Sequence, residues 1–571
     1  MSGYTPKHQA GGRPVRRRVV MAMAAAAVVI AGGGIYLGAA AGSGGGPRAH
    51  AAIRSPGPPT TPAPTTTTTT VAVSAPFTSA LTAGWVAREN ALPGTQAWKL
   101  TRPADQHQIQ GYASTVSVDL GGSLQLFVST TAPSWSVQAF RMGYYGGDEG
   151  RLLWSSPTYP GVDQPACPLQ APTNTVECSW RDPVPVSTAG WPQGTYLFKL
   201  QSSTGWQAYI PLTVRDDSSH SAFLVNDSVT TWQAYNLYGG YDLYQGANGS
   251  LATRARAVSF DRPYALGNGA GDFLGLELPM ISMMESHGLD VSYTTDVNLS
   301  EDPALVEQHR TFVSLGHDEY YSLAMFQGLT TARNDGVSLI FLGANAVYRH
   351  IRLNSTPLGP DRLEIDYKNA TADPLYGHDN ADVTPWAWRD PPNNAPESAL
   401  LGEMWQCNPV RADMVITDPS DWVFDGSGLT QGSHIAGIVG PEYDHFSPAV
   451  PNPGDVTVLA ASPVDCSGRH STADMTYYSA PSGAGVWDTG TIDWVGQVMS
   501  GCSTCAPPNP VTRITDNVLA AFGAGDPGRV HPSTANMGGS PPTTAPIPPV
   551  GTPAGSPAGG SAAGSGAGAG G

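Results

Sequence analysis

The segment TFVSLGHDEYYS, residues 311–322, carries the strongest fold signal in the chain. Its first half is an apolar run that predicts a short buried strand, and this run breaks at Gly316. Four polar or ionisable residues follow at once: His317, Asp318, Glu319 and Tyr320. Because burying such groups is costly unless each finds a partner, the segment indicates a satisfied turn, a metal site or an acid–base pair.

Segments around this strand alternate between strand-like and helix-like patterns. SAFLVND (221–227), LDVSYTTD (289–296) and VSLIFLGAN (337–345) predict strands, whereas DFLGLELPMISMMESHG (272–288) has helical spacing. This alternation predicts right-handed crossovers and a mainly parallel sheet. We therefore expect residues 217–526 to form an α/β, mainly parallel three-layer domain of the glutamine-amidotransferase or flavodoxin-like kind. Ligands of such sheets bind beyond the carboxyl ends of the strands.

Residues 80–216 have a different pattern, with short alternating runs separated by turn residues. The runs are STVSVDL, SLQLFVST, WSVQAFRMG, GTYLFKLQS and WQAYIPLTVRD. Such runs are typical of antiparallel strands, so we expect an Ig-like β-sandwich before the α/β domain.

The N-terminal end of the chain predicts export. Residues 1–18 form a basic tail, and the mostly apolar residues 19–46 are long enough to cross a bilayer, which needs roughly 20 residues. Positive charge before this run predicts a single-pass anchor in the cell membrane, with the N-terminus inside and the bulk of the chain outside the cytoplasm. The alternative is a secreted protein with a cleaved signal peptide, for which AHA at 49–51 is a cleavage site. A twin-arginine signal is a further alternative.

The composition of the chain limits the kinds of molecule that the protein binds and predicts two unstructured segments. The net charge of −17 argues against a nucleic-acid partner. The Pro- and Thr-rich residues 47–79 predict an extended stalk, and the Pro-, Gly- and Ala-rich residues 527–571 predict a disordered tail.

Six cysteines in an exported chain predict disulfides. Proximity in sequence pairs Cys167 with Cys178, Cys407 with Cys466, and Cys502 with Cys505. The last pair could instead be redox-active or half of a zinc site, but a second CxxC is missing from the sequence.

The expected sheet edge is rich in oxygen donors. The sequence has no G-x-S-x-G elbow, Walker A loop or H-E-x-x-H motif. The oxygen-bearing residues near the expected strand ends are Tyr235, Tyr238, Tyr264, Glu319, Tyr320 and Asn345, with His317 nearby. Carboxylate and phenolate oxygens suit a hard cation, above all ferric iron. The competing interpretation is structural: each tyrosine packs in the core and His317 caps a loop.

Several strings in this order resemble the large, catalytic subunit of N,N-dimethylformamidase and its relatives, over residues 105–523. They are FRMGYYGGDEGRLLW, WPQGTYLFKLQSSTGWQAYIPLTVRDD, TWQAYNLYGGYDLY, SFDRPY, SLGHDEYYS, FLGANAVYR and GAGVWDTGTIDW. The resemblance departs from the family at Tyr321, where the motif H-x-E-Y-W-S has tryptophan. The small subunit and the amino-terminal lectin-like region of the enzyme are also not evident.

The resemblance implies a mononuclear Fe(III) site with two tyrosines and one glutamate as ligands. Carried over to this sequence, the ligands are Tyr235, Tyr264 and Glu319, with Tyr238 as the alternative tyrosine. His317 and Asn345 match the positions that act as base or orient the substrate. The implied reaction is hydrolysis of the C–N bond of a small amide-like substrate, which gives a carboxylic acid and an amine.

Two alternatives stay open. The sandwich, stalk and anchor also fit a non-catalytic cell-surface binding protein on a retained hydrolase-like scaffold, because fold does not fix function. The second alternative keeps the pocket but changes the ester, amide or glycan-linked substrate. A homo-oligomer also stays open.

Overall fold

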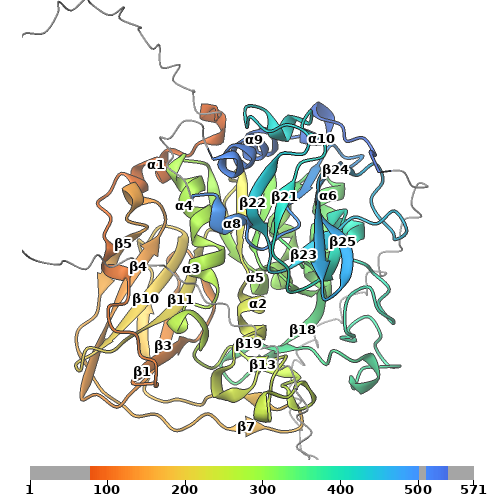
Figure 1. Ribbon diagram of the computed structural model, residues 1–571. Helices are drawn as coiled ribbons and strands as arrows, with labels where there is room; N and C mark the ends of the chain where they lie inside the picture. Colours follow the sequence, from red (N-terminus) through yellow and green to blue (C-terminus); the bar gives the residue numbers. More distant parts are fainter. Residues whose placement is uncertain (1–76, 500–508, 538–571) are drawn as a thin grey trace, which may run out of the picture. The chain divides into compact units, whose positions relative to one another are not determined.

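Figure 1 shows the computed structural model, which describes residues 77–499 and 509–537. These residues belong to one compact unit. The predicted span at 19–46, the stalk up to residue 76, Cys502 with Cys505, and the tail beyond residue 537 lie outside the described residues. Within the described ranges, no helix combines the length and the apolar character that a membrane crossing requires.

Two sheets occupy the part of the chain before residue 216, with the strand orders β1–β3–β9 and β2–β11–β10–β4–β5; β6 also pairs with β4. The strands are β1 Ile109–Ala113, β2 Ser117–Asp119, β3 Ser123–Thr130, β4 Ser134–Met142, β5 Gly150–Ser155, β6 Tyr159–Pro160, β9 Val184–Ser187, β10 Gly194–Ser202 and β11 Gln207–Arg215. Side chains from both sheets share one buried core, which includes Leu126, Val137 and Phe198.

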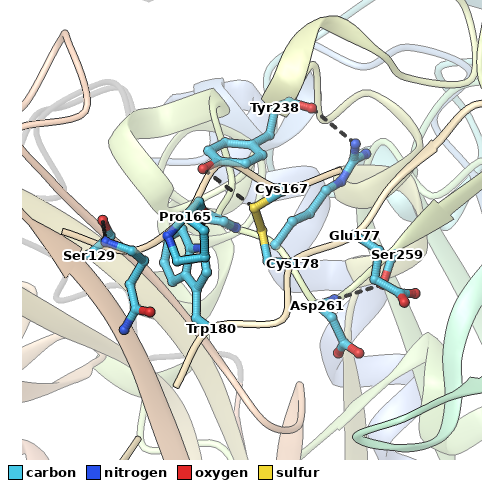
Figure 2. The surroundings of a disulfide bond; sticks show 12 residues. Ser129, Pro165, Cys167, Glu177, Cys178, Trp180, Tyr238, Ser259 and Asp261 are labelled. Atoms are coloured by element: carbon cyan, nitrogen blue, oxygen red, sulfur yellow. Dashed lines mark hydrogen bonds between the residues drawn. A yellow bond between two sulfur atoms is a disulfide. The ribbon is translucent and has the colours of Figure 1, made fainter. Parts of the chain in front are cut away.

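A small hairpin of β7 Leu169–Gln170 and β8 Thr175–Val176 carries the disulfide Cys167–Cys178. Figure 2 shows this disulfide between Trp180 and Tyr238. The backbone N–H of Cys178 donates to the carbonyl of Asp261 at 2.8 Å, which ties the hairpin to the residues that follow β13. A second disulfide joins Cys407 and Cys466. Both pairings expected from spacing are confirmed.

The rest of the chain is organised around a seven-stranded sheet with the order β14–β12–β15–β17–β26–β25–β24. Its strands are β12 Phe223–Asp227, β14 Val291–Thr295, β15 Thr311–Gly316, β17 Ser338–Gly343, β24 Thr457–Cys466, β25 Arg469–Ser479 and β26 Gly485–Asp488. Neighbours from β14 to β26 are parallel, and β25 and β24 run antiparallel.

The same part of the chain also contains smaller, separate sheets. The four-stranded sheet β13–β19–β18–β16 comprises β13 Ala257–Ser259, β16 Tyr320–Ser322, β18 Arg349–Thr356 and β19 Gly359–Ile365. Two pairs complete the set: β20 Met404–Cys407 with β23 Tyr443–His445, and β21 Ala412–Val415 with β22 His434–Val439. Because β16 and β18 begin shortly after β15 and β17 end, the second sheet fixes the loops between them.

The helices are mostly short. They are α1 Gly84–Asn90, α2 Val229–Ala234, α3 Phe273–Leu276, α4 Leu278–Ser286, α5 Asp296–Glu301, α6 Leu323–Asn334, α7 Ser398–Leu401, α8 Trp494–Gln497, α9 Pro510–Ala524 and α10 Pro527–Val530. Among the described residues, only α4, α6 and α9 are longer than seven residues.

The predicted fold class, a mainly parallel three-layer α/β domain after an Ig-like sandwich, is therefore wrong. The described chain is mostly β, with 26 strands spread over several sheets and ten α-helices. The helices expected at 272–288 and before Gly336 are present as α3, α4 and α6, but other long segments between the strands hold no crossover helix. Residues 235–272, for example, hold short 3₁₀ turns and β13. Residues 404–479 are mainly antiparallel strands.

The central strands β15 and β17 both end at glycines, where the backbone packs closely against its neighbours. Gly316 and Gly343 are paired in register at the ends of β15 and β17, and a Cβ on Gly343 would lie 2.0 Å from the Gly316 carbonyl oxygen. Gly316 has φ +60, and a Cβ there would lie 2.6 Å from Leu276. Only glycine fits both positions, so the chain leaves the sheet at a fixed point and direction.

Candidate functional site

The site is built on the loop between β15 and β16, where the opening segment places its polar residues. His317, Asp318 and Glu319 are all buried, with at most 7% of any of them exposed. Asp318 is held as part of the fold: its Oδ2 accepts hydrogen bonds from Ser314 Oγ (2.8 Å) and Tyr321 Oη (2.6 Å). The carboxylate of Glu319, in contrast, faces the tyrosines that follow α2.

Two phenols converge on the Glu319 carboxylate. Tyr235 Oη donates to Glu319 Oε2 at 2.7 Å. Tyr244 Oη lies 3.0 Å from Oε1 and 3.2 Å from Oε2. The two phenol oxygens are 3.0 Å apart, and their rings stack with centroids 4.7 Å apart. Tyr235 is the first tyrosine after α2, and Tyr244 reaches the same point after a tight loop through Gly239 and Gly240, both with positive φ.

Two buried cations balance this cluster. Arg349 Nε donates to Glu319 Oε1 at 3.0 Å. Lys368 Nζ donates to Tyr320 Oη (2.8 Å), which in turn donates to Tyr244 Oη (2.7 Å). Burial, and then the charge of Arg349, lowers the pKa of Lys368 to about 8. These contacts join Glu319, Tyr244 and Tyr320 with the two cations in one hydrogen-bonded network.

Burial and neighbouring charges shift the pKa of the Glu319 carboxylate and the pKa values of the two phenols in opposite directions. Burial opposes ionisation of Glu319, but the contact with His317 and the charge of Arg349 hold its pKa well below the usual range. Burial raises the pKa of both Tyr235 and Tyr244 well above its ordinary value. Without a bound cation, the site therefore holds a carboxylate between two neutral phenols.

His317 lies beside the same carboxylate. Its Nε2 is 3.5 Å from Glu319 Oε2, an ion-pair distance that leaves Nε2 without a hydrogen-bond partner among the described residues. Burial lowers the pKa of His317, but the contact with Glu319 and the charge of Glu442 outweigh it and raise the pKa to about 9. The imidazole is thus a buried, charged group whose Nε2 is ion-paired with Glu319.

Glu442 is a second carboxylate on the His317 side of the site. It precedes β23, and its oxygens accept hydrogen bonds from Trp405 Nε1 (2.6 Å) and Asn408 Nδ2 (2.8 Å). Burial raises the pKa of Glu442, while the charge of His317 lowers it.

Asn345 comes from the turn after β17. The turn is tied to the Glu319 loop, because Val347 N–H donates to the Asp318 carbonyl at 3.1 Å and Arg349 N–H to the Glu319 carbonyl at 2.9 Å. Asn345 Oδ1 is buried and has no hydrogen-bond partner in the described part of the chain. An unpartnered amide oxygen and a charged imidazole therefore lie on adjacent, connected loops.

The other two tyrosines named from sequence have different surroundings. Tyr264 packs edge-on against Trp232, with ring centroids 6.2 Å apart, and lines a cavity of about 20 Å³ with Arg262 and Arg362. Tyr238 Oη lies 4.0 Å from Cys167 Sγ, beside the disulfide (Figure 2). The structure thus brings Tyr235, Glu319 and His317 together and adds Tyr244.

The donor set fits one hard cation. Among residues 77–499 and 509–537, no group of three or more His, Cys, Asp or Glu side chains is placed to hold a metal ion. Phenols supply the additional donors here: Tyr235 Oη, Tyr244 Oη and Glu319 Oε2 are 2.7 to 3.2 Å apart. Neighbouring ligands of an octahedral cation with bonds of about 2.0 Å lie about 2.8 Å apart, so these oxygens match one face of an octahedron.

A comparison with protein families identifies the chain. The model of the family described as "N,N-dimethylformamidase beta subunit-like, C-terminal" matches residues 136–506. The chain belongs to this family. The match includes every site residue described above.

Two curated relatives agree. The N,N-dimethylformamidase beta subunit of Paracoccus aminophilus is 23% identical over 353 residues, which cover 54% of this chain and 45% of the relative. The subunit of the same name from Alcaligenes sp is 22% identical over 348 residues, covering 53% of this chain and 44% of the relative. The alignment therefore spans less than half of each relative's length.

Four site residues were missed from the sequence: Tyr244, Arg349, Lys368 and Glu442. Tyr244 and Arg349 are the last residues of the strings TWQAYNLYGGYDLY and FLGANAVYR, so the signal was present but not used. Lys368 and Glu442 lie in segments without such strings, and only the fold brings them to the site.

Proposed function

We propose that the protein hydrolyses the C–N bond of a small amide with one ferric ion held at Glu319. The observation that supports this most is the convergence of Tyr235 and Tyr244 on Glu319, next to the imidazole of His317. The family relationship supports the same reaction class. A surface-binding protein would have no need of a buried carboxylate between two phenols.

Glu319, Tyr235 and Tyr244 would hold the ion. Tyr264, the second tyrosine carried over from the family motif, is the alternative to Tyr244 in this set. A bound ferric ion polarises a carbonyl or acidifies a water. Arg349 and Lys368 add positive charge beside the phenols, which favours their ionised form.

The remaining groups would handle the substrate and the protons. A cation bound at Glu319 would offset the negative charge that keeps His317 protonated, so the imidazole would become neutral and its Nε2 could take a proton from the attacking water and return it to the leaving nitrogen. The C–O bond forms as the C–N bond breaks, so amide plus water gives carboxylic acid plus amine. Asn345 would orient the amide group, and Glu442 would hold the imidazole in place through its charge.

Export is a second part of the proposal. The basic residues 13–18 before the apolar run, and the two disulfides in the folded part, support a location outside the cytoplasm. A reporter fused at the N-terminus should be cytoplasmic, and one fused after residue 80 should be outside. A cytoplasmic signal from both would contradict export.

Turnover tests the reaction class. Protein reconstituted with ferric iron is incubated with N,N-dimethylformamide and with a series of larger N-alkyl amides, and the amine and acid released are quantified. Glu319→Ala should abolish release and lose the iron, whereas His317→Ala should lose release and keep most of the iron. Glu307→Ala, which removes an exposed carboxylate, is the matched control and should change neither. Release that survives Glu319→Ala would contradict the proposal.

A further inference from the structure

The turn that presents Asn345 has a backbone that its sequence does not favour. Asn345 has φ +63 and Val347 has φ +55. Asparagine adopts the left-handed region readily, but this region costs a β-branched residue such as valine roughly 1–2 kcal/mol. Surrounding contacts must therefore hold this turn in place.

Three hydrogen bonds hold it. Two come from the neighbouring loop, where the Asp318 and Glu319 carbonyls accept from Val347 and Arg349. The third is different in kind: Asn345 N–H donates to the side chain of Asp444, at Oδ1, over 2.8 Å. It is the contact that the backbone of Asn345 itself makes.

Asp444 is itself held firmly. It lies in β23, pairs with Trp405 of β20, and is 1% exposed. Its own N–H donates to the Gly490 carbonyl at 3.1 Å, just beyond β26. Because β26 neighbours β17 in the central sheet, Asp444 connects the turn to the same sheet from which the turn emerges.

We infer that Asp444 is a positioning residue, which fixes the Asn345 turn so that the Asn345 carboxamide faces the reacting groups. Its effect on turnover rests on the proposed function, whereas its effect on the turn does not. Asp444 has no hydrogen bond to Glu319, Tyr235 or Tyr244 among the described contacts, so it should act on the substrate side of the site and not on the cation side.

The chemistry of the contact predicts which substitutions it tolerates. Burial, and then the nearby charge of Asp488, raises the pKa of Asp444 well above its usual range, which favours a neutral carboxyl group. Asparagine has nearly the same shape and keeps an oxygen that can accept from Asn345 N–H. Leucine has a similar volume and no acceptor.

Hydrogen exchange on metal-free protein tests the turn. Asp444→Leu should speed exchange of the amides in residues 343–350 by about tenfold, because a buried hydrogen bond is lost. Asp444→Asn should stay within about twofold of the wild type. Asp290→Leu is the matched control: it removes a half-buried carboxyl that accepts from Ala222 N–H, and it should leave residues 343–350 unchanged.

Turnover of N,N-dimethylformamide by the iron-loaded protein tests the consequence. Asp444→Leu should lower kcat at least tenfold and keep the visible iron band, and Asp444→Asn should restore kcat. In an Asn345→Ala background, Asp444→Leu should add less than a twofold loss, because both changes remove the same function. Wild-type exchange in Asp444→Leu, or independent losses in the double variant, would overturn the inference. If the wild type fails to turn over the amide, the proposed function fails for that substrate, and the exchange data alone decide the role of Asp444.

Discussion

Removing one partner of the Arg141–Glu285 ion pair should strongly destabilise the protein. Arg141 lies in β4 and Glu285 in α4, so the pair joins the N-terminal sheets to the rest of the described fold, and both side chains are fully buried. Other groups complete the pair: Tyr145 Oη, Gln193 O, Asn90 Nδ2 and Tyr293 Oη. Each charge is therefore paired and hydrogen-bonded.

The expected loss in the free energy of unfolding comes from the partner charge that stays buried without its counter-ion. Breaking a buried pair by removing one partner costs about 3–5 kcal/mol, whereas replacing both partners with apolar residues of similar volume is close to neutral. In Arg141→Met, Tyr293 and Asn90 still donate to Glu285, so we expect about 3 kcal/mol. Glu285→Leu should cost about as much, and the double variant Arg141→Met/Glu285→Leu should recover most of the loss.

Urea unfolding measures this directly. The transition is followed by far-UV circular dichroism and by tryptophan fluorescence, and the two curves must coincide before a free energy of unfolding is extracted. If each single variant stays within about 1 kcal/mol of the wild type, the pair is not the buried junction described here. A double variant as unstable as the sum of both singles would refute the reasoning that unpaired charge causes the loss.

Three further predictions concern the sheet edge, the disulfides and pH. Gly316→Ala should cost several kcal/mol more than Gly336→Ala in urea unfolding, because both have positive φ but a Cβ meets Leu276 only at Gly316. Removing Cys407–Cys466 should cost about 1.5 kcal/mol more than removing Cys167–Cys178, as the sequence separations of 59 and 11 imply under the chain-entropy model. The folded-state pKa of His317, about 9 against an ordinary 6.5, means that its pairing stabilises metal-free protein fully below pH 6.5 and is lost as the pH rises through 9. His317→Gln should remove that decline; equal pH profiles for both proteins would contradict it.

Individual strands could be predicted from the sequence where an apolar run ends on turn residues. TFVSLG, SAFLVND and VSLIFLGAN contain β15, β12 and β17. The fold class could not be predicted in the same way, because a short apolar run fits a strand or a buried helix equally well. The helices expected at 272–288 and before Gly336 are present as α3, α4 and α6, whereas residues 235–272 are loops and 3₁₀ turns held by positive-φ glycines and side-chain hydrogen bonds. Local periodicity does not report such contacts.

The candidate site shows the same limit. The position of Glu319 follows from its place at the end of a buried strand, and Tyr235 follows from the motif. The segment TWQAYNLYGGYDLY offers four tyrosines, however, and sequence spacing does not say which of them faces Glu319. The left-handed glycines at 239 and 240 turn the chain so that Tyr244 returns to Tyr235, and Tyr238 packs beside the disulfide. The disulfides were easier, since proximity along the chain was enough.

The visible spectrum of protein reconstituted with ferric iron tests the central claim most directly. The account predicts one iron per chain and a phenolate-to-iron band that weakens in both Tyr235→Phe and Tyr244→Phe. Tyr264→Phe and Tyr238→Phe should leave the band unchanged, since neither phenol is hydrogen-bonded to Glu319 in the described structure. A band lost in Tyr264→Phe and kept in Tyr244→Phe would contradict the ligand set, and bound iron without any visible band would contradict phenolate ligation itself.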